Sequence, residues 1–185
     1  MEDHLAFERS YWGDCCNTFD EDQKHYIYAK YMGLSIVNYS FNVLGSSVLD
    51  IGGGPSSMLL KCINLKRGMV WDPITYPQWT VDRYQSKSID VTVAGGEIMY
   101  ESGWDEVWLY NCLQHVEDPS IILFNAVRSA KILRIFEWVD VPAHDGHPHT
   151  LTKESLDGWI GKEGSVVTLA TQGCYGNAYH GVFYQ

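Results

Sequence analysis

The segment from Val48 to Ser57, VLDIGGGPSS, constrains the fold of this chain most. An apolar run that contains Asp50 is followed at once by three glycines, an order typical of a strand that turns sharply into a helix. Glycine suits such a turn, because a Cβ would keep the backbone away from a ligand and would resist a positive φ. Since Pro55 fits a first helical position, we expect a helix from Pro55 to Leu65 that Gly68 closes.

Extended and helical segments alternate along the rest of the chain. We expect strands at 47–51, 69–71, 89–93, 106–110, 132–139, 166–171 and 178–184, and helices at 20–43, 119–129 and 152–160, the last two capped by Asp118 and Thr152. This alternation predicts an α/β fold, a Rossmann-like, doubly wound and mostly parallel sheet with helices on both faces. The last two strands could pair antiparallel and form the edge of the sheet at the C-terminus.

The length of 185 residues is that of one domain, and we expect a helical segment at 1–45 to lie over a core at 46–185. The net charge of -10 and the absence of any Lys/Arg run argue against nucleic acid as a partner and favour a small molecule. The polar N-terminus and the lack of a long apolar stretch predict a cytoplasmic protein with no membrane contact. The odd set of five cysteines, without CxxC spacing, is expected of reduced thiols.

A second acidic residue stands at the expected end of the second strand. Asp72 lies 22 residues after Asp50, where a carboxylate can accept hydrogen bonds from both hydroxyls of a ribose. The spacing therefore indicates a ligand that contains a nucleoside.

These residues resemble the motifs of a known protein family. The segment VLDIGGGPSS resembles the glycine motif of class I S-adenosylmethionine-dependent methyltransferases, in particular the small-molecule branch. The segment from Gly103 to Pro119, GWDEVWLYNCLQHVEDP, resembles their fourth-strand region, and the resemblance extends roughly from Ser47 to Val139. The chain departs from the pattern where Ser56 and Ser57 replace a further glycine and where a Pro-Gly-Gly turn is missing before the fifth strand. The resemblance implies transfer of a methyl group from S-adenosylmethionine to a small-molecule or terminal acceptor.

The resemblance also implies which residues meet the cofactor. Asp50 would serve the methionine ammonium directly or through water, Asp72 would hold the ribose, and Glu97 would meet the adenine amino group. The cofactor-binding residues expected in this way are Trp12, Tyr28, Asp50, Gly52, Gly53, Gly54, Asp72, Pro73, Glu97, Ile98, Asn111, Cys112 and Leu113. For Trp12 and Tyr28 the alternative is an ordinary apolar face that packs on the sheet.

Three histidines are candidates for catalysis. His115 could take a proton from an attacking hydroxyl or amine, or it could fix a loop by a hydrogen bond. His147 and His149 belong to the run VPAHDGHPH at 141–149, directly after the fifth strand, where one of them could face the substrate. No second, distant set of ligands accompanies this run, so we expect no metal. Glu137 could reach the pocket or pair within the sheet.

Other interpretations remain open. The glycine segment could be a structural turn, or the chain could bind S-adenosylmethionine or a nucleoside without catalysis. An NAD-dependent oxidoreductase is the third possibility, although a dinucleotide site usually has a third glycine, and Asp50 would repel a pyrophosphate.

Overall fold

The computed structural model describes residues 5–171 and 173–185. Within them, one large sheet has seven strands in the order β6-β5-β3-β7-β8-β10-β9. Its strands are β3 (Ser47–Ile51), β5 (Arg67–Asp72), β6 (Ile89–Val93), β7 (Trp104–Tyr110), β8 (Ala130–Val139), β9 (Ser165–Thr171) and β10 (Cys174–Tyr184). The first five are parallel, whereas β10 runs antiparallel to both β8 and β9. The predicted mostly parallel sheet with an antiparallel edge is confirmed.

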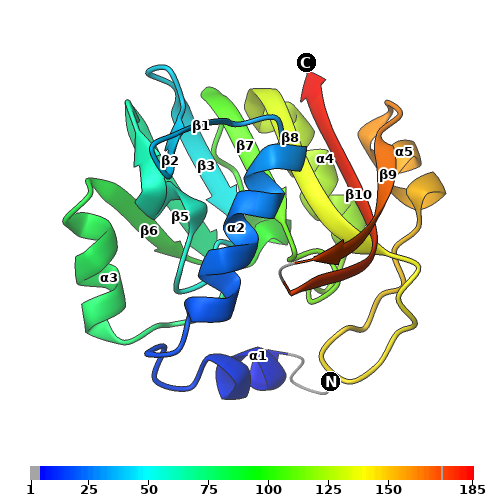
Figure 1. Ribbon diagram of the computed structural model, residues 1–185, viewed down its shortest axis with the longest axis horizontal. Helices are drawn as coiled ribbons and strands as arrows, with labels where there is room; N and C mark the ends of the chain where they lie inside the picture. The colour runs from blue at the N-terminus through cyan, green and yellow to red at the C-terminus, as the bar shows by residue number, and fades with distance from the viewer. Residues whose placement is uncertain (1–4, 172) are drawn as a thin grey trace.

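Helices cover both faces of this sheet. They are α1 (Leu5–Trp12), α2 (Phe19–Tyr31), α3 (Gln78–Gln85), α4 (Pro119–Ser129) and α5 (Lys153–Ile160), with the short 3-10 helices η1 (Met58–Lys61) and η2 (Gly96–Ile98). Helix α2 crosses one face and α4 and α5 lie on the other, while α1 lies beyond the ends of the strands (Figure 1). No helix in the described part of the chain combines the length and the apolarity needed to span a membrane.

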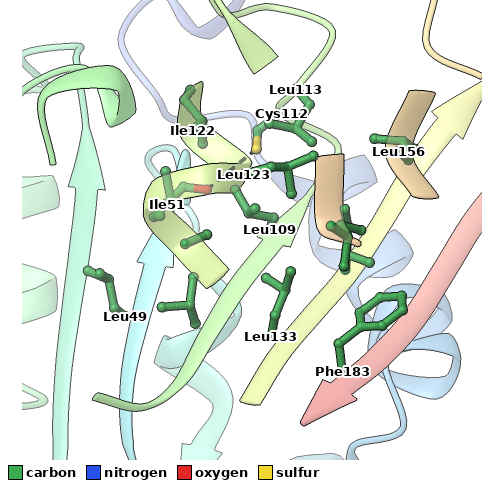
Figure 2. Packing of buried hydrophobic residues seen from close by; sticks show 14 of the residues in the cluster. Leu49, Ile51, Leu109, Cys112, Leu113, Ile122, Leu123, Leu133, Leu156 and Phe183 are labelled. Atoms are coloured by element: carbon green, nitrogen blue, oxygen red, sulfur yellow. Dashed lines mark hydrogen bonds between the residues drawn. The ribbon is translucent and has the colours of Figure 1, made fainter. Parts of the chain in front are cut away.

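The strands bury side chains on both faces, as parallel strands between two layers of helix must. On one face, apolar side chains of the central strands pack against α4 and α5. Figure 2 labels Leu49, Ile51, Leu109 and Leu133 of the strands and Ile122, Leu123 and Leu156 of the helices. On the other face, Val48, Val70 and Trp108 pack with Tyr28 of α2 and with Met32, which directly follows the helix. Because side chains alternate along a strand, neighbours such as Val48 and Leu49 serve opposite cores.

Local capping explains why two of the predicted helices have nearly the expected bounds. The Asp118 carboxylate accepts hydrogen bonds from the Ser120 and Ile121 amides, and Pro119 takes the first turn of α4. Thr152 and Ser155 form a reciprocal capping box at the start of α5. Gly161, at φ +75°, ends α5.

The helix expected from Pro55 to Leu65 is wrong. The segment contains only η1, whose Leu59 amide donates to the Ser57 hydroxyl, and then the two-residue strand β4 (Cys62–Ile63). Strand β4 pairs in parallel with β2 (Ser40–Asn42), with Phe41 opposite Cys62. This pairing overrides a modest helical tendency, because propensity is weak beside tertiary hydrogen bonding. Gly68 accordingly lies inside β5 and ends no helix.

The helix expected at 20–43 is too long. Helix α2 ends at Tyr31, and Gly33 follows at φ +67°, a left-handed conformation that stops a helix. The remaining residues form the hairpin of β1 (Ser35–Val37) and β2, whose turn places Asn38 and Tyr39 at positive φ. The apolar residues of 20–43 therefore belong to one helix and two short strands, although their spacing predicted a single helix.

Candidate active site

A cavity of about 610 Å³ opens at the carboxyl ends of the parallel strands. Strand β3 lies between β5 and β7, so the chain leaves it toward one side of the sheet and later returns to the other. Such a point in an open α/β sheet is where ligands bind. The cavity is lined by the glycine loop (Gly52–Gly54), by residues that follow β5, β6 and β7, and by the N-terminal helix α1.

The glycine loop needs its glycines for two physical reasons. Gly52 and Gly54 have φ of +73° and +63°, which other residues adopt only at a cost. A Cβ on Gly52 would lie 2.7 Å from the Cβ of Cys112, and one on Gly53 would lie 2.6 Å from Oδ2 of Asp50. All three glycines line the cavity, so their backbone is the surface that a ligand meets.

Asp50 lies behind this loop and does not line the cavity itself. Its Oδ2 accepts hydrogen bonds of 2.5 Å from the hydroxyls of Ser57 and Tyr110. Its Oδ1 is buried and has no hydrogen-bond partner among the described residues. Burial raises the pKa of Asp50 to about 7, although the two hydroxyl bonds oppose the shift. The site therefore has a carboxyl group that is partly protonated at neutral pH and that a nearby cation would ionise fully.

Asp72 ends β5 and lines the cavity together with Pro73. Its Oδ2 accepts a hydrogen bond of 3.0 Å from the Gly54 amide, and its Oδ1 accepts bonds from the Ile74 amide and the Tyr76 hydroxyl. Burial raises its pKa, against these hydrogen bonds. Asp72 thus joins the glycine loop to the end of the second parallel strand, and the register of β3 and β5 brings both sequence-predicted acids to one end of the sheet.

The segment after β6 contributes Glu97 but not Ile98. Glu97 lines the cavity, and its Oε1 accepts hydrogen bonds from the amides of Glu117 and Asp118. Ile98 is 69% exposed and is not among the lining residues. The difference follows from the turn of η2, which directs neighbouring side chains to different sides.

The segment after β7 is held in place by hydrogen bonds to a buried acidic side chain. Asn111, at φ +50°, and Cys112 line the cavity, whereas Leu113 is fully buried in the core. The Glu137 carboxylate accepts hydrogen bonds from the amides of Cys112 and Leu113. Glu137 does not line the cavity, and its hydrogen-bond partners lie in the loop after β7, so neither the pocket nor pairing with a strand neighbour describes its position. Burial raises the pKa of Glu137 to about 7, against these hydrogen bonds.

The predicted catalytic histidines separate into two groups. His115 and His147 line the cavity with their ring centroids 4.4 Å apart, but His149 does not line it, and its Nε2 lies 2.8 Å from the Val116 carbonyl. Burial, with the neighbouring His115 and His144, lowers the pKa of His147 to about 4. Burial also lowers the pKa of His115, but a hydrogen bond and the charge of Glu8 outweigh it, so this pKa lies above its ordinary value.

No metal-binding arrangement occurs in the described part of the chain. His144 and His147 bridge each other through their backbones at 2.9 and 3.0 Å and have ring centroids 4.4 Å apart. Even so, no group of three or more His, Cys, Asp or Glu side chains in residues 5–171 and 173–185 could hold a metal ion.

The two aromatic candidates also differ. Trp12 lines the cavity next to the glycine loop, and a Cβ on Gly54 would lie 3.7 Å from its ring. Tyr28 does not line it, because α2 turns Tyr28 toward the sheet, where its ring packs 4.7 Å from that of Phe136. Tyr28 therefore belongs to the apolar core, which was its alternative interpretation.

Several lining residues were missed from the sequence. They are Leu5, Phe7, Glu8, Tyr11, Glu21, Lys24, His25, Tyr76 and Trp138, among others. Seven of the nine residues named come from α1 and α2, which lie far in sequence from the glycine loop and carry no motif of their own. Tyr76 could have been suspected from its position four residues after Asp72, to which its hydroxyl donates.

Comparison with solved structures identifies the architecture. An S-adenosylmethionine-dependent methyltransferase from Aquifex aeolicus superposes with a TM-score of 0.63 at 16% identity, over 98% of this chain and 99% of that one. A Burkholderia thailandensis 1,6-didemethyltoxoflavin-N1-methyltransferase with bound S-adenosylhomocysteine gives 0.66 at 13% identity, over 98% and 87%. The chain has the class I methyltransferase fold.

This methyltransferase fold does not determine the reaction. The [4+2]-cyclase SpnF superposes with a TM-score of 0.54 at 18% identity, over 79% of this chain and 57% of that one. No protein-family model matches the sequence, and no curated protein matches it. The function must therefore be argued from the cavity and its residues.

Proposed function

We propose that the protein transfers a methyl group from S-adenosylmethionine to a small-molecule or terminal acceptor. The observation that carries this proposal is the convergence of the glycine loop, Asp72 and His115 on one cavity at the switch point of the sheet. The cavity volume of about 610 Å³ is in the range of sites for small ligands. The likeness in fold to methyltransferases supports the same interpretation.

The local structure after the glycine loop favours this ligand over a dinucleotide. A pyrophosphate is normally bound at the N-terminus of a helix, where free amides and the helix dipole meet its charge. Here residues 58–61 form a four-residue 3-10 helix and 62–63 a strand, so the loop leads into no α-helix. The loop instead has the Asp50 carboxyl behind it, which suits a ligand with an ammonium group and no phosphate.

The residues present fit such a ligand. Asp72 would accept hydrogen bonds from the ribose hydroxyls, and Glu97, which lines the same cavity, would meet the adenine. The Gly52–Gly54 backbone would lie against the methionine part, with Asp50 behind it. The unpartnered Oδ1 of Asp50 gives a specific reason to expect a positive group nearby, because a buried acceptor without a donor is costly. Trp12 offers an aromatic face to a sulfonium.

S-adenosylmethionine supplies a methyl group on a positively charged sulfur, which is transferred by in-line displacement. The protein has to align the acceptor atom and take up its proton. The Nδ1 atom of His115 faces two oxygen acceptors, the Gly146 carbonyl and Glu8, so it carries hydrogen. Its Nε2 then has the free lone pair and is the atom we assign as the base. His147, which stays neutral, lies beside it and lines the same cavity.

The test has a binding arm and a turnover arm. Isothermal calorimetry should detect S-adenosylmethionine and S-adenosylhomocysteine and should find much weaker binding of NAD. Mass spectrometry of the native protein after purification would show whether an adenosyl compound accompanies it. A protein that binds NAD in preference to both adenosyl compounds would overturn the proposal.

Binding alone would leave a non-catalytic module as the alternative, because affinity for the cofactor does not show that its methyl group is transferred. Transfer of a labelled methyl group to a panel of small acceptors should therefore be followed with the wild type and His115→Ala. The proposal expects unchanged cofactor affinity and lost turnover in His115→Ala. Tight cofactor binding with no transfer to any acceptor tested, and equal behaviour of the variant, would support the module.

A further inference from the structure

Helix α1 contacts the site through aromatic and apolar side chains and through one acidic side chain, Glu8. The helix buries none of its residues fully, yet Glu8 and Phe7 both make specific contacts with the opposite wall of the cavity. The Glu8 Oε1 lies 2.9 Å from Nδ1 of His115, and both side chains are mostly shielded, at 16% and 17% exposure. An ion pair at this depth is screened less by solvent than a pair on the surface.

Phe7 joins α1 to the turn at Gly146. Its ring covers Gly146 so closely that a Cβ there would stand 2.4 Å from Phe7 Cδ1. Gly146 has φ +86° and lies in the turn between His144 and His147, which bridge each other through their backbones. The carbonyl of the same glycine is 2.8 Å from Nδ1 of His115. Helix α1, the turn at Gly146 and His115 therefore form one connected unit.

Two acceptor oxygen atoms close to Nδ1 of His115 determine which ring nitrogen carries the hydrogen. Because the Gly146 carbonyl and the Glu8 carboxylate are both acceptors, Nδ1 must donate, and Nε2 is left unprotonated in the neutral ring. The carboxylate also stabilises the imidazolium that forms when Nε2 takes up a proton. This is the role of the carboxylate that orients a catalytic histidine in hydrolase triads.

We propose that Glu8 is a positioning residue for His115, and that docking of α1 both covers the cavity and completes the general base. The catalytic part of this proposal rests on the proposed function. The Glu8–His115 pairing itself does not, because it can be measured in the protein without any ligand.

The groups that face His115 come from several elements, and some raise its pKa while others lower it. Glu8 of α1 and Glu137 of β8 favour its charged form, and the Gly146 carbonyl acts in the same sense. Burial opposes them. Removing Glu8 should therefore leave burial dominant, so that the pKa of His115 falls.

The test is a histidine titration by NMR, with the His115 signal assigned from its loss in His115→Gln. We expect the pKa of His115 to fall by about one unit or more in Glu8→Gln. Glu8→Asp keeps the charge and should restore part of the shift. Asp14→Asn is the matched control, because Asp14 follows α1 and binds the Cys16 amide instead. An identical titration in wild type and Glu8→Gln would overturn the proposal.

A second variant separates docking from charge. Phe7→Ala removes no charge, yet it should also lower the pKa of His115, because it loosens α1 from Gly146 and withdraws Glu8. An unchanged pKa in Phe7→Ala would refute the docking part.

Once an acceptor is found, Glu8→Gln should lower kcat and move the pH profile of kcat, while the affinity for the cofactor changes little. A change in KM alone would contradict a role in positioning the base. If the protein fails to bind S-adenosylmethionine, the proposed function falls, but the titration still decides whether Glu8 holds His115.

Discussion

The backbone of Gly52 lies directly against the side chain of Cys112, and a methyl group on Gly52 would stand 2.7 Å from Cys112 Cβ and 3.1 Å from its Sγ. The Cys112 thiol in turn lies 3.5 Å from the Ile51 carbonyl, a contact that Figure 2 shows between the two segments. The loop after the first parallel strand and the loop after β7 are therefore fitted to each other, and each limits where the other can lie.

Gly52→Ala should disturb this fit, and Gly45→Ala gives the matched control. Both glycines have positive φ, +73° and +82°, but a Cβ on Gly45 would meet nothing within 4 Å. We expect Gly45→Ala to cost about 1–2 kcal/mol of stability from backbone strain alone. Gly52→Ala should cost more than that and should also weaken cofactor binding. Urea unfolding and calorimetry measure the two effects, and equal losses in both variants would show that the contact with Cys112 is unimportant.

Cofactor binding should depend on pH through Asp50. Its pKa of about 7 in the free protein means that the carboxyl is partly protonated at neutral pH. A ligand with an ammonium group favours the ionised form, so binding should release a proton, and affinity should rise as pH increases through about 7. Calorimetry in buffers of different ionisation enthalpy measures the proton release.

The Asp50→Asn variant is the control for this titration. It has no proton to lose, so it should bind more weakly at pH 8 and show a flatter dependence between pH 6 and 8. If wild type and variant have the same slope, another group must account for it.

Asp72→Asn should weaken the binding of S-adenosylmethionine by at least about tenfold, since a hydrogen bond to a charged group contributes roughly 1.5–3 kcal/mol. The amide keeps the size of the side chain but has only one acceptor oxygen, so the variant loses the hydrogen bond from either the Gly54 or the Ile74 amide, and urea unfolding should accompany the binding measurement. Asp90→Asn, at an exposed position of β6, should bind as the wild type does. Undiminished affinity in Asp72→Asn would remove this carboxylate from the binding site.

Glu137 should make stability depend on pH. Its pKa is raised to about 7 in the folded protein, so folding favours the protonated form, and this contribution to stability is lost as pH rises through about 7. Glu137→Gln cannot ionise. Relative to this variant, the wild type should lose stability on the order of 3 kcal/mol between pH 5 and 8. Urea unfolding at several pH values tests this, and Glu163→Gln, at an exposed loop position, should follow the wild type. A constant difference between wild type and Glu137→Gln would contradict the assigned pKa.

The parts of the fold that the sequence predicted well are those with strong local determinants. Asp118 and Pro119 begin α4 where expected, and the strand at Ile89–Val93 has the predicted bounds. The segment after Pro55 failed because its structure depends on a partner far away in sequence, the short strand that contains Phe41. Such pairing leaves no periodicity in the segment itself.

The same distinction holds for the candidate site. Asp72 and the three glycines could be placed at the cavity because each stands at the end of a predicted strand. Glu8 could not, since nothing in the sequence of α1 indicates that it returns to His115, more than a hundred residues later. Tyr28 illustrates the opposite error, because an aromatic residue near the site by sequence turned out to face the sheet.

The short 3-10 helix after the glycine loop has a consequence for how the protein can be shortened. Because residues 58–61 form only this short helix, much of the same face of the sheet is covered by Tyr28 of α2 and by Met32, which directly follows α2. A polypeptide that began at residue 46 would expose Val48, Val70 and Trp108 to water, and we would expect it to aggregate in place of folding as a shorter protein. Deletion studies should therefore remove α1 alone and stop before Phe19.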